Sequence, residues 1–264
     1  MPKIGIIGGS GVYSLDDIEN PKKESVITPY GESPEMVIGE VGGNEVAFMP
    51  RHGKEHSEPP HRINFRANIK ALKNIGVERV IATTAVGSLS SEISPGDFVV
   101  IDQFLDFTKD RNSTFYDGKL GKAMHVDMTE PYCSELREIL IERSENLDIP
   151  IHTSGTYVCT EGPRYETAAE IQMFNQLGGD VVGMTNVPEA VLARELEMCY
   201  STVSVVTNYG AGIGDEKLTH SEVKEIMEEN VSKVKELIFS AIPKLPLERS
   251  CGCGNALDGA EVNP

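Results

Sequence analysis

Arginine and histidine residues gather in one short stretch of the chain, PRHGKEHSEPPHR, at residues 50–62. Arg51 and His52 follow directly after an apolar run, NEVAFMP, that has the composition of a strand. A guanidinium is a bidentate donor, so an Arg–His pair at a strand end suits a bound phosphate. A metal site would need acidic or cysteine partners at ligand spacing, and the neighbours include arginine and lysine. A solvated polar loop has the same composition, so this stretch alone leaves both interpretations open.

A glycine-rich turn, GIIGGSG, follows the first apolar run of the chain. It departs from the dinucleotide-binding pattern G-x-G-x-x-G, because Ser14 stands at the third glycine position when Gly9 and Gly11 are the first pair. The backbone N–H groups of such a turn, together with the Ser10 hydroxyl, can bind an anion. A plain glycine turn explains the same residues equally well.

Three further apolar runs end in residues that can contact a ligand: Thr83, Thr84 and Ala85; Met184 and Thr185; and Asn208. Tyr165 and Glu166 stand between another such run and a helix-like pattern. Tyr165 can stack on a flat ligand, whereas Glu166 is also explained as a favourable charge near a helix N-terminus. A methionine at a strand end is usually a core residue. Each signal is ambiguous alone, but together they place small polar donors, one methionine and one aromatic at successive strand ends.

Strand-like runs alternate with helix-like patterns, and this alternation predicts how those residues are positioned. The runs lie at residues 3–9, 44–50, 79–87, 97–105, 156–162, 180–185 and 201–208. A capping box, Thr167 to Glu170, opens one helix pattern, and Thr219 to Glu222 opens the last one. The pattern predicts an α/β protein, a three-layer α/β/α sandwich with a central mixed sheet. Ligands bind at the strand ends of such sheets.

Composition limits the possible partners and location. The net charge of −17 argues against nucleic acid and anionic membrane surfaces as partners. No apolar run has the length of a membrane span, and the N-terminal residues lack a signal-peptide pattern, so we expect a cytoplasmic protein. An anionic substrate would have to be bound by local donors rather than attracted by the overall field.

The chain divides at about residue 248. Residues 1–248 are expected to form one domain, and residues 249–264 a polar, glycine-rich tail that is loosely ordered. The tail carries a C-x-C pair in CGCG, and the chain has five cysteines in all. In a reducing cytosol these would be thiols. A single C-x-C lacks a second ligand pair for zinc, so we expect no metal.

Motifs along the whole chain resemble one enzyme family. They are IGIIGGSG, RHG, INFRANIKALK, TTAVGSL, PGDFVVIDQF, FYDG, HVDMTEPYC, EGPRYET, GMTNVPEAVLARELEMCY and TNYGAG, in order from residue 3 to about residue 242. They are similar to those of the trimeric purine nucleoside phosphorylase and methylthioadenosine phosphorylase family. The resemblance implies the nucleoside phosphorylase fold and cleavage of a purine nucleoside by orthophosphate, a co-substrate, without any cofactor. It also implies disulfides of Cys251 and Cys253, because heat-stable archaeal members carry similar C-x-C tails.

The resemblance also implies roles for individual residues. The phosphate site maps onto Ser10, Arg51, His52, Thr84, Ala85 and Thr185, and Thr185 also contacts the sugar. Met184 lies under the ribose, Tyr165 stacks on the base, and Tyr209 and Gly210 belong to the substrate site. His125 matches a residue that reaches into a neighbouring subunit's site. The resemblance therefore implies a homotrimer or a dimer of trimers.

Departures from the family pattern predict the substrate. Members that act on 6-aminopurines carry aspartate where this chain has Asn208, in a T-D-Y-D pattern that is TNYG here. A carboxamide donates to a 6-oxo oxygen and accepts from a protonated N7, while Glu166 accepts from the N1–H of a 6-oxopurine. We therefore expect a purine nucleoside phosphorylase for inosine and guanosine, with Asn208, Glu166 and His52 as its catalytic residues.

His220 matches a position that is apolar in the methylthio-specific branch and histidine in the nucleoside branch, which predicts a bond to the 5′-hydroxyl. A capping-region side chain facing water is the alternative for His220. The rival functions are methylthioinosine phosphorylase, then methylthioadenosine phosphorylase, and a non-catalytic nucleobase-binding protein.

Overall fold

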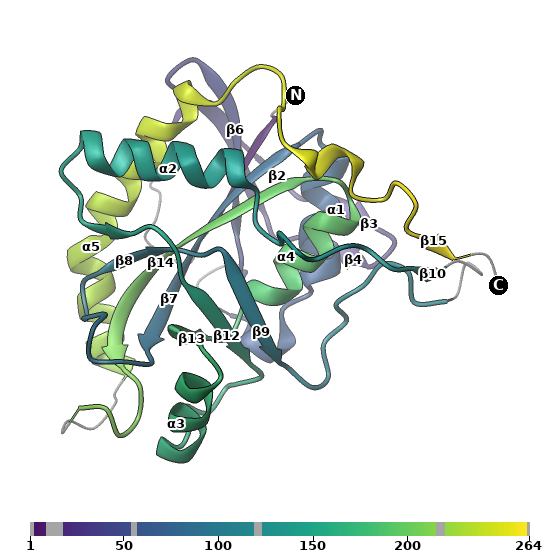
Figure 1. Ribbon diagram of the computed structural model, residues 1–264. Coiled ribbons are helices and arrows are strands. Elements are labelled where there is room, and N and C mark those ends of the chain that lie inside the picture. Colours follow the sequence, from purple (N-terminus) through teal and green to yellow (C-terminus); the bar gives the residue numbers. More distant parts are fainter. Residues whose placement is uncertain (1–2, 9–17, 54–56, 119–122, 215–219, 263–264) are drawn as a thin grey trace.

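An eleven-stranded mixed sheet forms the centre of the molecule (Figure 1). The computed structural model describes residues 3–8, 18–53, 57–118, 123–214 and 220–262, with side chains of the last segment from Val223 onward. The main strand order is β11-β8-β14-β7-β1-β6-β5-β2. The strands on this path are β11 (Ile151–His152), β8 (Phe98–Val100), β14 (Cys199–Tyr209), β7 (Arg79–Ser88), β1 (Ile4–Gly8), β6 (Asn44–Pro50), β5 (Met36–Val41) and β2 (Glu19–Glu24).

Four parallel strands run through the middle of this sheet. β1 pairs with both β6 and β7, and β7 pairs with β14, with Ile4 opposite Val46 and Arg79. Because these strands are parallel, their carboxyl ends meet at one edge of the sheet. β9 (Gln103–Phe107), β12 (Thr156–Thr160) and β13 (Val181–Gly183) form a branch that joins β7 through the antiparallel β13. The predicted mixed sheet is confirmed.

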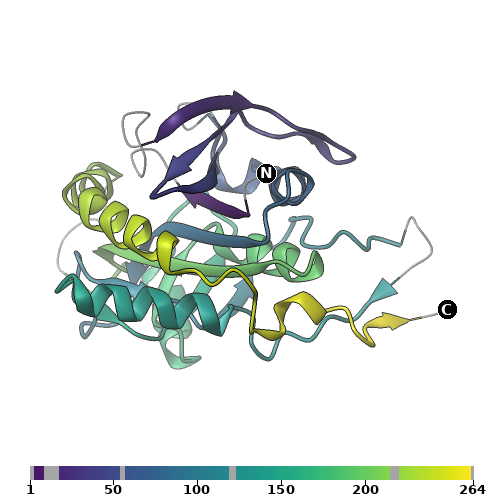
Figure 2. The same ribbon diagram turned by 90° about the horizontal axis from the view of Figure 1, so that it is seen from above.

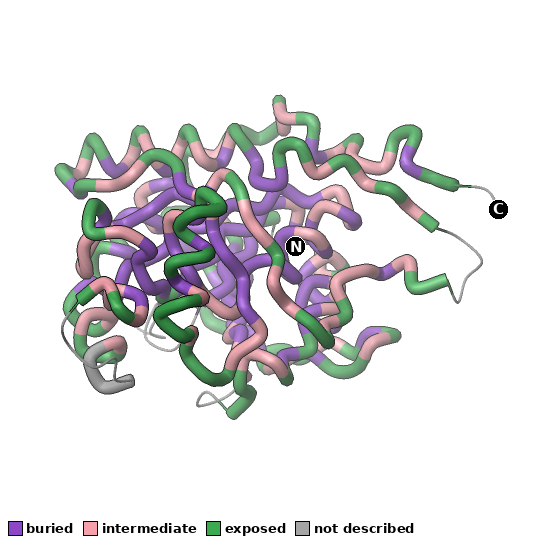
Figure 3. The backbone as a smooth tube through the Cα atoms, turned by 60° about the horizontal axis from the view of Figure 1, so that its bottom comes forward, coloured by how far each residue is buried: buried purple, intermediate pink, exposed green. Residues whose placement is uncertain are grey.

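Helices cover both faces of the sheet, which gives the predicted three layers. α1 (Phe65–Asn74) and α4 (Asn186–Glu195) pack together on one face, where they bury Leu72 and Leu192. α2 (Ser134–Asn146) and α5 (His220–Ala241) pack together on the other, where they bury Leu140 and Leu237. Buried backbone is concentrated in the sheet between these layers (Figure 3). Within the described residues, no helix is long and apolar enough to cross a membrane.

Short elements complete the chain. α3 (Ala168–Gln176) begins with the predicted capping box, because Thr167 accepts from the Glu170 N–H and Glu170 accepts from the Thr167 N–H. The capping box predicted at Thr219 lies outside the described residues. The remaining elements are β3 (Ile27–Thr28), β4 (Gly31–Glu32), β10 (Ala123–Met124), β15 (Glu261–Val262) and the 3-10 helices Pro60–Arg62, Ile242–Lys244 and Gly252–Asn255.

The C-terminal tail is not loosely ordered, which corrects the expectation from its composition. Arg249 donates from Nη1 to the Glu197 carbonyl at 2.7 Å, and Ser250 donates from its N–H and hydroxyl to Glu135. The tail buries Cys253 and ends in β15, which pairs with β10 to form an arm beside the body (Figure 2). Specific hydrogen bonds and thiol contacts therefore order a segment whose glycine and polar content predicted the opposite. The division at residue 248 stays a prediction.

Candidate active site

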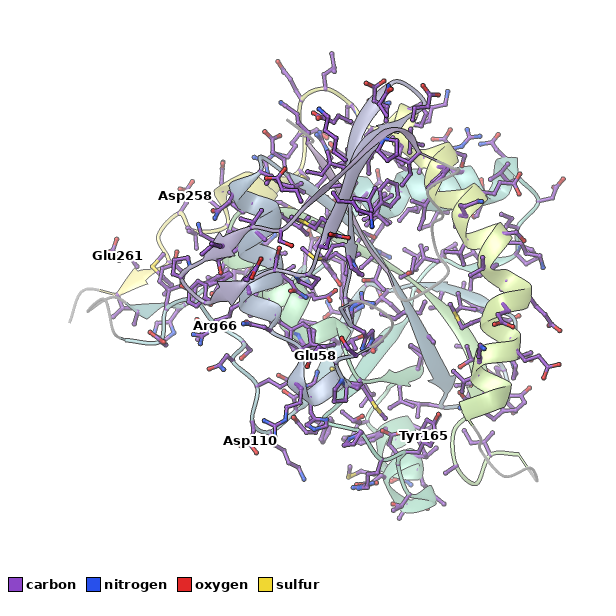
Figure 4. The ribbon with its side chains drawn as sticks, turned by 180° about the vertical axis from the view of Figure 1, so that it is seen from behind. Glu58, Arg66, Asp110, Tyr165, Asp258 and Glu261 are labelled. Atoms are coloured by element: carbon purple, nitrogen blue, oxygen red, sulfur yellow. The ribbon has the colours of Figure 1, made fainter. Side chains whose placement is uncertain are left out.

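A pocket of about 960 Å³ lies at the carboxyl ends of the central strands. Its lining comes from β7, from the segments that follow β6, β12 and β13, from the end of β14, and from one side of α5. The predicted site residues that line it are Arg51, His52, Thr84, Ala85, Tyr165, Glu166, Met184, Thr185, Asn208 and Gly210. Figure 4 shows Tyr165 beside α3, at the end of the molecule toward which the central strands point. The fold therefore brings together residues that the sequence places at separate strand ends.

Three predicted residues are not seen in this pocket. Ser10 lies outside the described residues, and so does the side chain of His220 at the start of α5. His125 is exposed and follows β10, and its N–H donates to the Ala260 carbonyl at 2.9 Å. β10 and β15 lie on the opposite side of the molecule from α5 (Figure 1). In a single chain, His125 is therefore remote from the pocket.

Tyr209 does not line the pocket either, which departs from its predicted role. Its hydroxyl donates to Ser94 Oγ at 3.2 Å, whereas its neighbour Asn208 lines the pocket. Successive residues of a strand point to opposite faces of the sheet. The Tyr209 side chain is directed toward Ser94, away from the pocket that Asn208 lines.

The end of the pocket at which the sequence predicts phosphate is built around a buried ion pair. Arg51 is 2% exposed and Glu189, in the first turn of α4, is fully buried. The guanidinium donates from Nε and Nη2 to the two carboxylate oxygens of Glu189, at 2.5 and 2.9 Å, and from Nη1 to the Thr83 carbonyl at 2.7 Å. Tyr200 donates its hydroxyl to the same carboxylate at 2.7 Å. Burial lowers the pKa of Arg51, but the Glu189 carboxylate outweighs it and raises that pKa.

This arrangement leaves donors for a ligand. A guanidinium has five N–H groups, and the three bonds to Glu189 and Thr83 leave one on each Nη atom. Because Arg51 lines the pocket, these are available to an oxyanion there. Glu189 was missed in the sequence, because an acidic residue after a proline in a first helical turn is a common N-terminal pattern.

His52 and Thr84 complete the polar end. His52 Nδ1 lies 2.9 Å from the Glu58 carbonyl. A carbonyl only accepts, so Nδ1 carries a proton. Thr84 shares a hydrogen bond of 2.8 Å with Ser204 on the next strand. Both residues are therefore held by the backbone or by a neighbouring strand before any ligand binds.

Asn208 has a fixed orientation at the other end of the pocket. Its Nδ2 donates to the Tyr209 carbonyl at 2.9 Å, and its Oδ1 lies 2.9 Å from the Thr207 hydroxyl. The pairing of β14 with β7 shifts register between Val206 and Asn208, and such a bulge redirects side chains. A Cβ on Gly87 would lie 2.9 Å from Nδ2, so a glycine is needed beneath the carboxamide. One N–H of the carboxamide remains for a ligand.

The loops after β12 and β13 carry Glu166 and Met184, and Arg111 joins them. Thr160 donates its hydroxyl to Glu166 Oε1 at 2.7 Å. Arg111 donates to the carbonyls of Met184, Thr160 and Glu161. No sequence pattern indicated this role, because the bonded carbonyls lie 49 to 73 residues away in sequence. The arginine thus fixes the spacing of the two loops.

A methionine at this strand end also requires a specific glycine. Gly162 has a φ of +66°, and a Cβ there would lie 2.6 Å from Met184 Sδ. A side chain at residue 162 would therefore be strained and would displace Met184 from its place in the pocket wall.

The arrangement as a whole has a cationic end at Arg51 and a hydrogen-bonding end at Asn208 and Glu166, and α5 lines one side with Val223, Met227 and Val231 together with Lys224 and Glu228. Such a pocket suits a ligand that combines an oxyanion with a flat polar ring. Among the described residues, one group of side chains is close enough to bind a metal ion, a set of four cysteines, and none of them lines this pocket.

The amino-acid sequence matches one known family over most of its length. Residues 3–243 match the phosphorylase superfamily. The chain belongs to this superfamily. The predicted family and the α/β nucleoside phosphorylase fold are therefore confirmed.

Individual relatives are similar over nearly the whole chain. The 6-oxopurine nucleoside phosphorylase of Pyrococcus furiosus is 59% identical over 98% of this chain and 99% of its own length. The probable S-methyl-5′-thioinosine phosphorylase of Methanothermobacter thermautotrophicus is 54% identical over 98% of this chain and 90% of its own length. The crystal structure of a methylthioadenosine phosphorylase from an antarctic soil metagenomic library has a TM-score of 0.92 and 38% identity, and the match covers 100% of this chain and 93% of that one. The predicted class, a nucleoside phosphorylase, agrees with these names.

We predict that Glu189→Gln impairs the use of phosphate as a substrate more than it impairs folding. The carboxamide cannot accept both guanidinium bonds, so Arg51 loses its fixed orientation and an uncompensated charge stays buried. The KM for phosphate should rise about tenfold or more, because a lost charge-assisted hydrogen bond is worth about 1.5–3 kcal/mol. Initial rates at varied phosphate, below the unfolding temperature of each variant, measure this.

Glu195→Gln is the matched control. Glu195 is a second buried carboxylate of α4, and it accepts from the Thr114 hydroxyl and the Phe115 N–H, away from the pocket. This variant should lose stability while its KM for phosphate stays within about twofold of the parent. Equal changes in KM for the two variants would contradict the assigned role of Glu189.

Proposed function

We propose that this chain is a purine nucleoside phosphorylase that cleaves 6-oxopurine nucleosides, inosine and guanosine, with orthophosphate. The products are the free base and ribose 1-phosphate. The observation that carries the proposal is the pair Asn208 and Glu166 on the wall of a pocket whose other end presents Arg51. The two ends correspond to the two parts of the reaction, the leaving base and the attacking oxyanion.

The hydrogen-bonding groups at the base end favour a 6-oxopurine. The Asn208 N–H that is not bonded to Tyr209 can donate to O6, and Oδ1 can accept from a protonated N7. The Glu166 carboxylate accepts from the N1–H of a 6-oxopurine. Adenine N1 is an acceptor, so it would meet that carboxylate lone pair to lone pair. An unsatisfied buried polar group costs about 1–3 kcal/mol, and sites built on such pairs reject the wrong base strongly.

The phosphate end would align the nucleophile. Arg51, His52, Thr84, Ala85 and Thr185 surround one end of the pocket, and Ser10 is assigned to the same site by resemblance. Holding phosphate against C1′ supplies the positional part of the rate enhancement. Asn208 stabilises the negative charge that develops on the departing purine, which is the electrostatic part. Phosphate is the co-substrate, and these steps need no organic cofactor or metal.

A methylthioinosine phosphorylase is the second candidate, because the pocket has an apolar wall. Val223, Met227 and Val231 line it from α5, together with Lys224 and Glu228, and the apolar part of this surface favours a 5′-methylthio group over a hydroxyl. His220 is predicted to bond a 5′-hydroxyl and so to favour inosine and guanosine. The base pocket is the same for both candidates, so only the 5′ substituent separates them.

A neighbouring subunit would complete the site. His125 is exposed and remote from its own pocket, and the arm that precedes it extends from the body (Figure 4, near Asp258 and Glu261). A residue assigned to the substrate site but remote from it in one chain is explained when it serves a second copy. We therefore propose a homotrimer or a dimer of trimers.

A panel of nucleosides tests the proposed function. Phosphorolysis of inosine, guanosine, adenosine, methylthioinosine and methylthioadenosine is compared by kcat/KM, with and without phosphate. We expect no turnover without phosphate, and a preference for 6-oxopurines of at least about a hundredfold, from one to two unsatisfied buried groups. Equal cleavage of adenosine and inosine would contradict the base assignment. Binding of bases without phosphate-dependent turnover would indicate a non-catalytic protein, and a tenfold preference for methylthioinosine would favour the second candidate.

We predict that Asn208→Asp shifts the preference toward 6-aminopurines only in part. The aspartate accepts from a 6-amino group, but Glu166 still opposes adenine N1, so the ratio of adenosine to inosine kcat/KM should rise about tenfold. Combining it with Glu166→Gln should raise the ratio by more than the product of the single effects, because both residues read one base edge. Asn175→Asp on α3, outside this pocket, is the control and should leave the ratio unchanged. An unchanged ratio in Asn208→Asp would show that residue 208 does not read the base.

We predict that sites are shared between subunits. Chains carrying His125→Ala and chains carrying Asn208→Ala should each lose most of their activity. Mixed trimers contain sites with an intact Asn208 from one chain and an intact His125 from the other, so co-refolding the two variants should restore activity. Each variant refolded alone under identical conditions is the control. A mixture no more active than the sum of the two separate variants would refute the shared site.

A further inference from the structure

Four cysteines from three distant parts of the chain meet on the side opposite the pocket-lining end of β14. Cys133 immediately precedes α2, Cys199 begins β14, and Cys251 and Cys253 belong to the tail. Their Sγ atoms all lie within 4.8 Å of one another, and those of Cys199 and Cys251 are 3.4 Å apart. The expectation that the C-x-C lacks a second ligand pair is therefore wrong, because the fold supplies it.

The geometry suits one ion better than separate pairs. Tetrahedral zinc with Zn–S distances of about 2.3 Å places its sulfur ligands roughly 3.8 Å apart. Disulfide bonds between the four residues would need only two close pairs, whereas here every pair is close. All five cysteines of the structure are free, so the disulfides implied for Cys251 and Cys253 are not formed in it.

Two arginines beside the four cysteines can compensate the negative charge of thiolates. Arg194 Nη1 donates to Cys253 Sγ at 3.8 Å. The guanidinium of Arg249 is also adjacent to Cys199. Four thiolates around a divalent ion carry a net charge of −2, and two arginines balance it. Paired disulfides are neutral and would leave both guanidinium groups beside uncharged sulfur.

The four cysteines are also largely shielded from solvent. Cys133, Cys199 and Cys253 are buried, with Leu136 beside them, and Cys251 is half-buried. Metal binding removes the thiol protons.

We propose that Cys133, Cys199, Cys251 and Cys253 bind one zinc ion, independently of the catalytic site. Soft thiolate ligands in a tetrahedral set select zinc among the common divalent ions. The ion would fasten the tail to α2 and β14. Because β15 pairs with β10, and Ala260 accepts from the His125 N–H, it would also hold in place the arm that carries His125.

The test uses the full chain, produced with added zinc and purified anaerobically without chelators. Inductively coupled plasma mass spectrometry should find about one zinc per chain. After denaturation with a chelator, alkylation should modify all five cysteines of the chain. Cys251→Ala, which changes the half-buried ligand, should lower the zinc content at least tenfold while circular dichroism shows a retained fold. Cys159→Ala changes the buried cysteine outside the cluster and should keep its zinc.

Three results would overturn the proposal. One is a chain with only traces of metal whose denatured mass is lower by two hydrogens for each bonded pair, which would show disulfides. Another is iron in place of zinc. The third is the same zinc content in Cys251→Ala as in the parent chain, which would show that zinc binds elsewhere.

Discussion

The ion pair between Arg51 and Glu189 is the interaction on which the rest of the site depends. It joins the residue after β6 to the first turn of α4, and both side chains are almost completely buried. A buried charge is tolerated only when it is paired and fully hydrogen-bonded, and here Tyr200 and the Thr83 carbonyl complete the bonding. The pair therefore fixes a cation at a strand end in a chain whose net charge is −17. An anionic substrate can bind there without attraction by the overall field.

The chemical groups that line the pocket differ between the end at Arg51 and the other end. Hydroxyl, imidazole and backbone groups surround Arg51, and a carboxamide and a carboxylate form the other end. The spacing between the ends is set by elements that do not touch a ligand. Arg111 ties the carbonyls of two loops together, a bulge in β14 redirects Asn208, and Gly87 leaves room beneath it. The proposed specificity for the base thus depends on backbone geometry as much as on Asn208 and Glu166.

Local patterns in the sequence predicted the fold and most of the pocket. Apolar runs that end in polar residues gave the strand ends, and parallel pairing brings such ends together, so Arg51, Thr84, Met184 and Asn208 were found. Glu189 was not found, because its neighbourhood is that of an ordinary helix start. Tyr209 was assigned to the substrate site by the resemblance, but its hydroxyl donates to Ser94 and it does not line the pocket. The four cysteines could not be grouped from sequence, because their contacts join the start of α2, the start of β14 and the tail.

The central claim is that one pocket binds phosphate at Arg51 and the 6-oxo edge of a purine at Asn208 and Glu166. A crystal structure with hypoxanthine and phosphate bound together measures this directly. The account predicts phosphate oxygens within hydrogen-bonding distance, about 2.7–3.2 Å, of the two Nη atoms of Arg51. It also predicts base O6 at the same range from Asn208 Nδ2 and N1 from a Glu166 carboxylate oxygen. Phosphate bound away from Arg51, or a base whose O6 faces solvent, would contradict it.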